Sequence, residues 1–192
     1  MPEIVEGDLK FYFESDSEAI KFDETNWHRH QMRSTLKAMD ILCSTGNHYW
    51  WLEIKDCLGH ERDNLPRLSA AEPDELPRVR EYIKKNRYEH LVTASRKKPF
   101  IVDEVYEKFR DTLVSLAVAS RSADTELSAF YSLFDTAKVV NVVLVLTWEG
   151  RDFKRLALRL QDKLNRCLAP YGVAGFVTDG TTQLPGQVWQ LQ

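Results

Sequence analysis

The sequence has few cysteines and no strong net charge, and each shortage excludes a class of protein. Its three cysteines, Cys43, Cys57 and Cys167, are far apart and have no CxxC spacing. This excludes a disulfide scaffold and a zinc finger and predicts reduced, mostly buried thiols. The net charge of −3 gives no global case for nucleic-acid binding. A surface for nucleic acid would therefore have to be a local basic patch.

Long apolar runs and two common catalytic motifs are also missing. No stretch reaches the length of about 20 apolar residues that a membrane-spanning helix needs. The acidic, polar stretch MPEIVEGDLK is unlike a signal peptide. We therefore expect a cytoplasmic protein with no membrane partner. The sequence contains neither a Gly-rich phosphate loop nor a GxSxG nucleophile elbow.

The composition is that of an ordinary globular domain. Of the 192 residues, 43% are hydrophobic and 29% are charged. A chain of this length can bury a substantial core. We found no internal repeat, low-complexity tract or domain linker, so residues 1–192 are predicted to form a single domain.

A predicted β-hairpin organises the chain. Residues 36–43 and 49–56 read as two strands that are joined by the turn Ser44-Thr45-Gly46-Asn47. Gly and Asn tolerate positive φ, which hairpin turns require. The alternating residues Trp50, Leu52 and Ile54 are predicted to face the core.

Charged residues interrupt this otherwise apolar hairpin. Asp40 is predicted to lie in the middle of the first strand. Glu53 and Lys55 are two residues apart on the second strand, so their side chains point to the same face. Charges in such a place are costly unless they are paired or bind a metal. The hairpin is therefore the candidate functional site.

The rest of the chain predicts an α/β fold. Residues 9–24 read as strands around a polar turn, residues 25–35 are ambiguous, and residues 57–80 read as a long loop. The apolar spacing predicts helices over residues 99–120 and 152–168, and a short charged helix within 78–94. Residues 138–148 predict a central strand that is covered on both faces. Shorter strands are predicted over 173–178 and 188–191. The hairpin, the helix from 99 and the strand from 138 together predict a right-handed βαβ crossover.

Asp40, a turn and then Glu53-Ile54-Lys55 resemble the core of the PD-(D/E)XK nuclease superfamily. In that family the first carboxylate lies on one strand of a hairpin and Glu-x-Lys on the next, followed by a helix and a buried strand. The resemblance covers about residues 36–148, with the C-terminal helix and strand as additions. The proline that often precedes the first acid is Met39 here. The resemblance implies a restriction-endonuclease-like fold, with a mixed central β-sheet flanked by helices.

The resemblance also implies a chemistry. Asp40, Glu53 and the backbone carbonyl of Ile54 would hold Mg²⁺ or Mn²⁺, because hard cations prefer oxygen ligands. The ion would activate a water and screen the charge on a phosphate. Lys55 would stabilise the transition state. The implied activity is that of an endonuclease or exonuclease on DNA, and many proteins of this fold act as homodimers.

Several neighbouring residues are candidates for the same site. A further metal ligand of the family could correspond to Asp23 or Glu24. Asp56, His60 and Arg62 follow the hairpin and could line the same cleft, or they could form a solvated loop.

Other features of the sequence have two readings each. His28 and His30 could bind a metal, but without further ligands a polar surface is the better interpretation. The basic clusters at residues 84–87 and 96–98 could follow a phosphate backbone or could simply be solvated. Trp50 and Trp51 could stack on bases, although at least one of them should be core.

Two alternatives to the nuclease site stay open. Glu53 and Lys55 could form a plain ion pair on an exposed sheet face, since Asp152-Phe153-Lys154 shows that the tripeptide pattern recurs by chance. The protein could also be a non-catalytic member of the same fold that binds nucleic acid or another protein.

Overall fold

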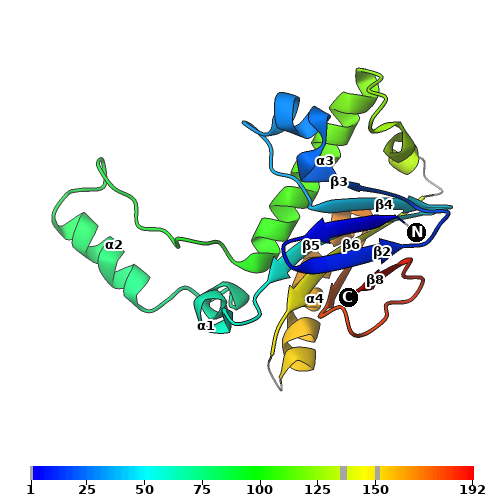
Figure 1. Cartoon of the computed structure of the whole chain (residues 1–192). Helices are drawn as coiled ribbons and strands as arrows, with labels where there is room; N and C mark the ends of the chain where they lie inside the picture. The colour runs from blue at the N-terminus through cyan, green and yellow to red at the C-terminus, as the bar shows by residue number, and fades with distance from the viewer. Residues whose placement is uncertain (1, 135–137, 150–151) are drawn as a thin grey trace.

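The computed structural model describes residues 2–134, 138–149 and 152–192 and has a mixed α/β architecture with two β-sheets (Figure 1). The predicted α/β class is confirmed. In the described part of the chain, no helix is both long and apolar enough to cross a lipid bilayer.

The larger sheet has five strands in the order β3-β4-β5-β6-β7. β3, β4 and β5 pair antiparallel, whereas β5, β6 and β7 pair parallel. The mixed pairing follows from the connections, because a short turn joins β4 to β5 and helices join the parallel strands. The strands are β3 (Glu18–Lys21), β4 (Ile41–Thr45), β5 (His48–Asp56), β6 (Val139–Thr147) and β7 (Ala174–Thr178).

A smaller antiparallel sheet covers one face of the larger one. It consists of β1 (Glu3–Glu6), β2 (Leu9–Phe13) and β8 (Trp189–Leu191), in the order β1-β2-β8. Phe11, Phe13 and Trp189 of this sheet are buried in one cluster with Trp50 and Leu52 of β5. Residues 9–24 therefore do form strands, as predicted, but β2 and β3 belong to different sheets.

Two long helices cover the opposite face. α3 (Ile101–Arg121) follows the predicted range 99–120, and α4 (Phe153–Leu168) follows 152–168. Trp51 of β5 packs on Phe109 of α3 with ring centroids 5.4 Å apart. β5 is thus buried on both faces, and so are Trp50 and Trp51. Stacking of either indole on a nucleic-acid base is excluded in this structure.

α3 connects the parallel strands β5 and β6, as the crossover prediction required. β6 lies between β5 and β7, and residues 141–147 are buried. The prediction of a central, covered strand is therefore confirmed.

The first strand of the hairpin begins later than predicted. β4 starts at Ile41, so Asp40 immediately precedes the strand instead of lying in its middle. α3 explains the difference, because its side chains accept hydrogen bonds from the preceding backbone. The amide of Lys37 donates to Asp111 Oδ2, and that of Met39 donates to Thr112 Oγ1, both at 2.9 Å. These amides have no neighbouring strand as partner.

Short helical segments occupy residues 25–35, which the sequence left ambiguous, and part of residues 57–80, where a loop was predicted. Residues 25–35 contain a π-helical turn, η2 (His28–Met32), which follows η1 (Phe22–Glu24). The predicted loop over 57–80 contains α1 (Glu61–Asn64) and η3 (Leu65–Leu68). The remaining turns are η4 (Ser128–Phe134) and η5 (Ala169–Tyr171).

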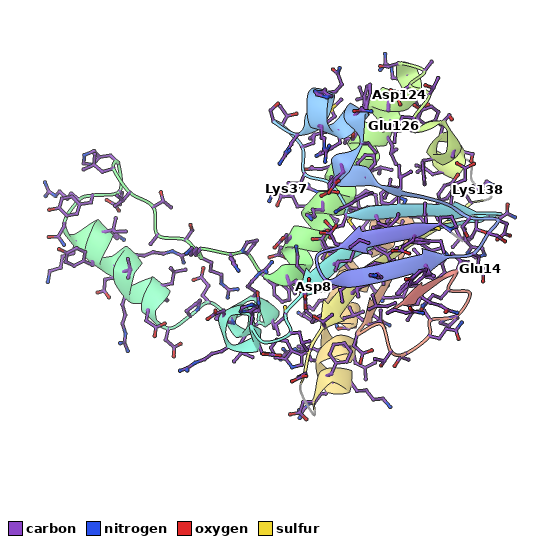
Figure 2. All side chains as sticks on the ribbon, viewed as in Figure 1. Asp8, Glu14, Lys37, Asp124, Glu126 and Lys138 are labelled. Atoms are coloured by element: carbon purple, nitrogen blue, oxygen red, sulfur yellow. The ribbon has the colours of Figure 1, made fainter. Side chains whose placement is uncertain are left out.

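The segment that connects η3 to α3 projects away from the two sheets (Figure 1). We call residues 69–99 the arm and the rest of the chain the body. The arm contains α2 (Glu75–Lys85), which lies partly within the predicted charged helix, and a return segment without regular structure. Side chains extend from the arm on both sides of its ribbon (Figure 2).

Candidate functional site

Asp40 lies where β4 and β5 separate. The pairing of these strands ends at Ile41 and Leu52. The amide of Asp40 still donates to the carbonyl of Leu52 at 3.1 Å. Beyond that point β4 no longer pairs with β5. The amide of Ile54 instead donates a hydrogen bond to Oδ2 of the Asp40 carboxylate at 2.7 Å. The acid is therefore held in place by the backbone of the hairpin.

Glu53 lies opposite Asp40 on the face of β5 that α3 covers. Its side chain is fully buried. Lys55, two residues further on the same face, places Nζ 2.6 Å from Glu53 Oε1. The alternative of an ion pair on an exposed sheet face is thus wrong, since Glu53 is 0% exposed and Lys55 is only 18% exposed.

Lys108 of α3 joins the two acids. Its Nζ lies 2.9 Å from Asp40 Oδ1, 2.7 Å from Glu53 Oε1 and 2.8 Å from Glu53 Oε2. Neither Lys55 nor Lys108 aligns an N–H with Glu53 Oε1 as a regular hydrogen bond, so at that oxygen the contacts are ion pairs. One cation is therefore shared by the two carboxylates that the sequence singled out.

Two further residues extend the arrangement. Lys55 Nζ is 3.0 Å from Glu104 Oε1, and Glu104 also pairs with the buried guanidinium of Arg67. We call the set of six side chains the charge cluster. It contains three acids and three bases: Asp40, Glu53, Lys55, Arg67, Glu104 and Lys108.

Burial sets the protonation behaviour of the cluster. It raises the pKa of Glu53 to about 7, and the charge of Asp40 acts in the same direction. Burial on its own would lower the pKa of Lys108, but the charges of Glu53 and Asp40 outweigh it and the pKa is raised. The pKa of Glu104 is lowered because Lys55 and Arg67 together outweigh the opposing effect of burial. The pKa values of Glu53 and Glu104 are thus shifted in opposite directions.

Asp23 lies beside the cluster, in η1. A surface cavity of about 370 Å³ is lined by Asp23, His28, Arg33 and Lys108, among other residues. Burial and the charge of Asp40 raise the pKa of Asp23 to about 6. Asp23 is therefore an accessory candidate whose pKa responds to the charge of Asp40.

The other accessory candidates have partners outside the cluster. Glu24 pairs with Lys21 and Arg29. Asp56 accepts hydrogen bonds from Thr147 and from the amide of Leu58. The structure places His60 and Arg62 on the exposed surface at α1. Arg67, five residues beyond Arg62, provides the arginine that enters the cluster.

The two histidines of η2 do not share a site. His28 is buried against Phe22, whereas His30 is exposed. Burial and the nearby charges of Arg33 and Lys108 lower the pKa of His28, which favours a neutral ring. Both basic clusters of the sequence, at 84–87 and 96–98, lie on the arm.

Lys108, Glu104 and Arg67 were not predicted from the sequence. Glu104 and Lys108 are four residues apart, so they lie on one side of α3. They also border the buried stripe that contains Ile101 and Val105. An acid and a base at that spacing, at the edge of an apolar stripe, are a signal that could have identified them. Arg67 had no such signal, because its position depends on the irregular path of residues 57–68.

The oxygen atoms of Asp40 and Glu53 fit a single hard cation, because both already contact one ammonium within 2.9 Å. Over residues 2–134, 138–149 and 152–192, however, no group of three or more His, Cys, Asp or Glu side chains could hold a metal ion. Any ion would therefore rely on two carboxylates together with water or substrate oxygens.

Comparisons with protein-family models, with curated proteins and with solved structures found no match to this chain.

Proposed function

We propose that the protein is a metal-dependent nuclease of the PD-(D/E)XK type that hydrolyses phosphodiester bonds, with DNA as the expected substrate. One observation carries the proposal: Asp40 and Glu53 converge on a single cation, and Lys55 lies 2.6 Å from Glu53. Two carboxylates and a lysine with little exposure to water are the groups that such chemistry needs.

The fold supports the same proposal. An antiparallel hairpin, a helical crossover and a parallel buried strand are the elements that a restriction-endonuclease-like core requires. Here they are β4, β5, α3 and β6. The cluster lies under α3 at the end of β5, where the sheet loses its β4 partner.

Asp40 and Glu53 would hold Mg²⁺ or Mn²⁺, which when bound lowers the pKa of a water ligand and neutralises charge on phosphate. Lys55 would orient the phosphate and stabilise the negative charge that builds on it. The backbone of Ile54 already orients Asp40, since its amide donates to Oδ2. Asp40 is thus pre-positioned before any substrate binds.

The Lys108 ammonium contacts both of the carboxylates that would hold the ion. For an ion to bind, its ammonium has to leave the two carboxylates. Lys108 lines the cavity that also contains Asp23, so the side chain has space on that side. Asp23 would then offer it a carboxylate partner. Lys108 is therefore an internal competitor for the metal site.

Calorimetric titration with Mn²⁺ tests the metal site. The wild type is expected to bind, and Glu53→Ala is expected to lose binding, because a single carboxylate remains. A cleavage assay with single-stranded, duplex and branched DNA and RNA then tests the activity. Equal traces of cleavage in wild type and Asp40→Ala would identify a contaminant and would contradict the proposal.

A second candidate function is a non-catalytic module of the same fold that binds nucleic acid or protein. The charge balance of the cluster favours it, since three bases already neutralise three acids without a metal. In that case the cluster would only join α3 to the sheet. The two candidates differ in Mn²⁺ binding, which the non-catalytic module lacks even when Lys108 is removed.

A further inference from the structure

The arm contains a helix that the body does not cover. α2 has 11 residues and none of them is buried. Isolated helices of fewer than about 12 residues are marginal in water, because most helical stability in proteins comes from packing an apolar face. A short helix such as α2 therefore needs a packing partner, which the described residues of one chain do not provide.

Large apolar side chains are exposed over residues 79–92 of the arm. Leu91 is 69% exposed and Tyr82 is 62% exposed. Such side chains are unremarkable singly, but a group of them on one projecting segment marks an interaction site. The large exposed hydrophobic residues of the arm are Val79, Tyr82, Tyr88, Leu91 and Val92.

Internal contacts hold the arm in shape without using this apolar surface. The guanidinium of Arg80 pairs with both carboxylate oxygens of Glu72 at 2.7 Å and donates to the carbonyl of Ala94. Arg96 donates to the carbonyl of Ser69 at 2.8 Å. Between α2 and the return segment lies a recess of about 330 Å³, which Ile83 and Val92 help to line. The arm therefore presents a preformed surface.

The net charge of the arm indicates which kind of surface it binds. The arm carries eight Lys and Arg side chains and five Asp and Glu, whereas the body carries 18 and 24. The arm is thus positive by three charges and the body negative by six. Complementary charge favours contact between an arm and a body. Since the arm projects away from its own body, the matching surface is that of another molecule (Figure 1).

We propose that the arm binds the body of a second copy of this chain, so that two copies exchange arms around a twofold axis. In such a dimer each arm contact occurs twice, which doubles the apolar area that is buried. Nucleic acid fits the arm less well, because three of the five large apolar side chains exposed on the arm are aliphatic and cannot stack on bases, and the negative body would repel phosphate. The proposal is independent of any nuclease activity.

Sedimentation equilibrium over a range of protein concentrations tests the proposal. The wild type is expected to reach twice the chain mass of 22.3 kDa. The double variant Leu91→Ser and Val92→Ser keeps the charge of the arm but removes apolar contacts, and should weaken dimerisation at least about tenfold. Leu91→Met is the matched control, because it keeps an apolar side chain at the same place on the arm. It should dimerise like the wild type, and circular dichroism should show the same fold for all three proteins.

Cross-linking locates the contact. Isotopically light and heavy copies are mixed, and a zero-length carbodiimide reagent joins amines to carboxylates. We expect links from Lys84 or Lys85 of one copy to body carboxylates of the other. The proposal would be overturned if the wild type stayed monomeric at a protein concentration of about 100 μM. It would also be overturned if the double serine variant dimerised like the wild type, or if the arm cross-links formed only within one copy. A monomer that binds duplex DNA through the arm lysines would overturn it as well.

Discussion

Lys108 of α3 places its ammonium between the two oxygens of Glu53 on β5, 2.7 Å from Oε1 and 2.8 Å from Oε2. A helix side chain thus acts as the counter-ion of a fully buried carboxylate on the central sheet. Whether this ammonium is a permanent structural partner or a substitute for a metal ion decides between the two candidate functions.

Removing Lys108 should strengthen metal binding if the nuclease proposal holds. Lys108→Met keeps most of the side-chain volume but leaves Asp40 and Glu53 without their shared cation. The affinity for Mn²⁺ should rise at least about tenfold, because the ion no longer has to displace an ammonium. Calorimetric titration measures it. Lys37→Met is the control, since Lys37, which is labelled in Figure 2, forms an exposed ion pair with Glu107 of α3. Unchanged or weaker binding by Lys108→Met would favour the non-catalytic module.

The stability of the protein should depend on pH through Glu53. Its pKa is raised from the ordinary value of 4.5 to about 7, chiefly by burial. Between these values the folded protein holds a proton that the unfolded chain has lost. The free energy of unfolding that this group contributes is therefore fully present below pH 4.5 and is lost as the pH rises through about 7.

The variant Glu53→Gln isolates this contribution, because glutamine does not titrate. The contributions of the other titrating groups are nearly the same in both proteins and cancel when the two stabilities are subtracted. From pH 4.5 to 7.5, the stability of the wild type relative to Glu53→Gln should fall by on the order of 3 kcal/mol. Urea denaturation at each pH measures the difference. A relative stability that rises with pH would mean that the pairs with Lys55 and Lys108 outweigh burial.

Lys55 and Asp40 should differ in their effects on metal binding. Lys55→Ala should leave Mn²⁺ binding nearly intact, since the carboxylates hold the ion. It should lower cleavage by roughly 10²–10³, which is the usual contribution of one positioned electrostatic group. Asp40→Ala should lose both binding and cleavage. Parallel titrations and single-turnover cleavage assays measure the two quantities, and loss of metal binding in Lys55→Ala would contradict the role given to Lys55.

Most of the fold could be predicted from the sequence because its signals are local. The apolar stripe of α3 and the Val/Leu run of β6 give their positions to within about two residues. The start of β4 could not be predicted, because Asp111 and Thr112 compete for the backbone of residues 37–39. The association of β1, β2 and β8 in a second sheet depends on contacts between the two ends of the chain, which no local pattern encodes.

Only the residues of the candidate site that belong to the hairpin could be predicted from the sequence. Asp40, Glu53 and Lys55 stood out because charge is rare in an apolar hairpin, and the structure brings them together. The helix-borne half, Glu104 and Lys108, lay within a helix whose apolar stripe explained the segment without them. The projection of the arm was equally hidden, since its charged composition suits any solvated helix.

Breaking the pair between Glu104 and Arg67 should destabilise the fold far more than breaking an exposed pair. The side chains of Glu104 and Arg67 are only 16% and 10% exposed. Glu104→Ala leaves Arg67 without its carboxylate and removes one of the two partners of Lys55. Loss of one member of a buried pair costs about 3–5 kcal/mol.

Glu72→Ala is the matched control, because Glu72 pairs with Arg80 on the exposed arm. Exposed pairs contribute little to the free energy of unfolding, because water screens their charges. Urea denaturation of both variants at pH 7 measures the two costs. Similar small losses in both would show that Arg67 and Lys55 reach solvent when Glu104 is absent. The charge cluster would then be open enough to admit a ligand without distortion of α3, whereas a large loss in Glu104→Ala alone would identify the cluster as a closed structural unit.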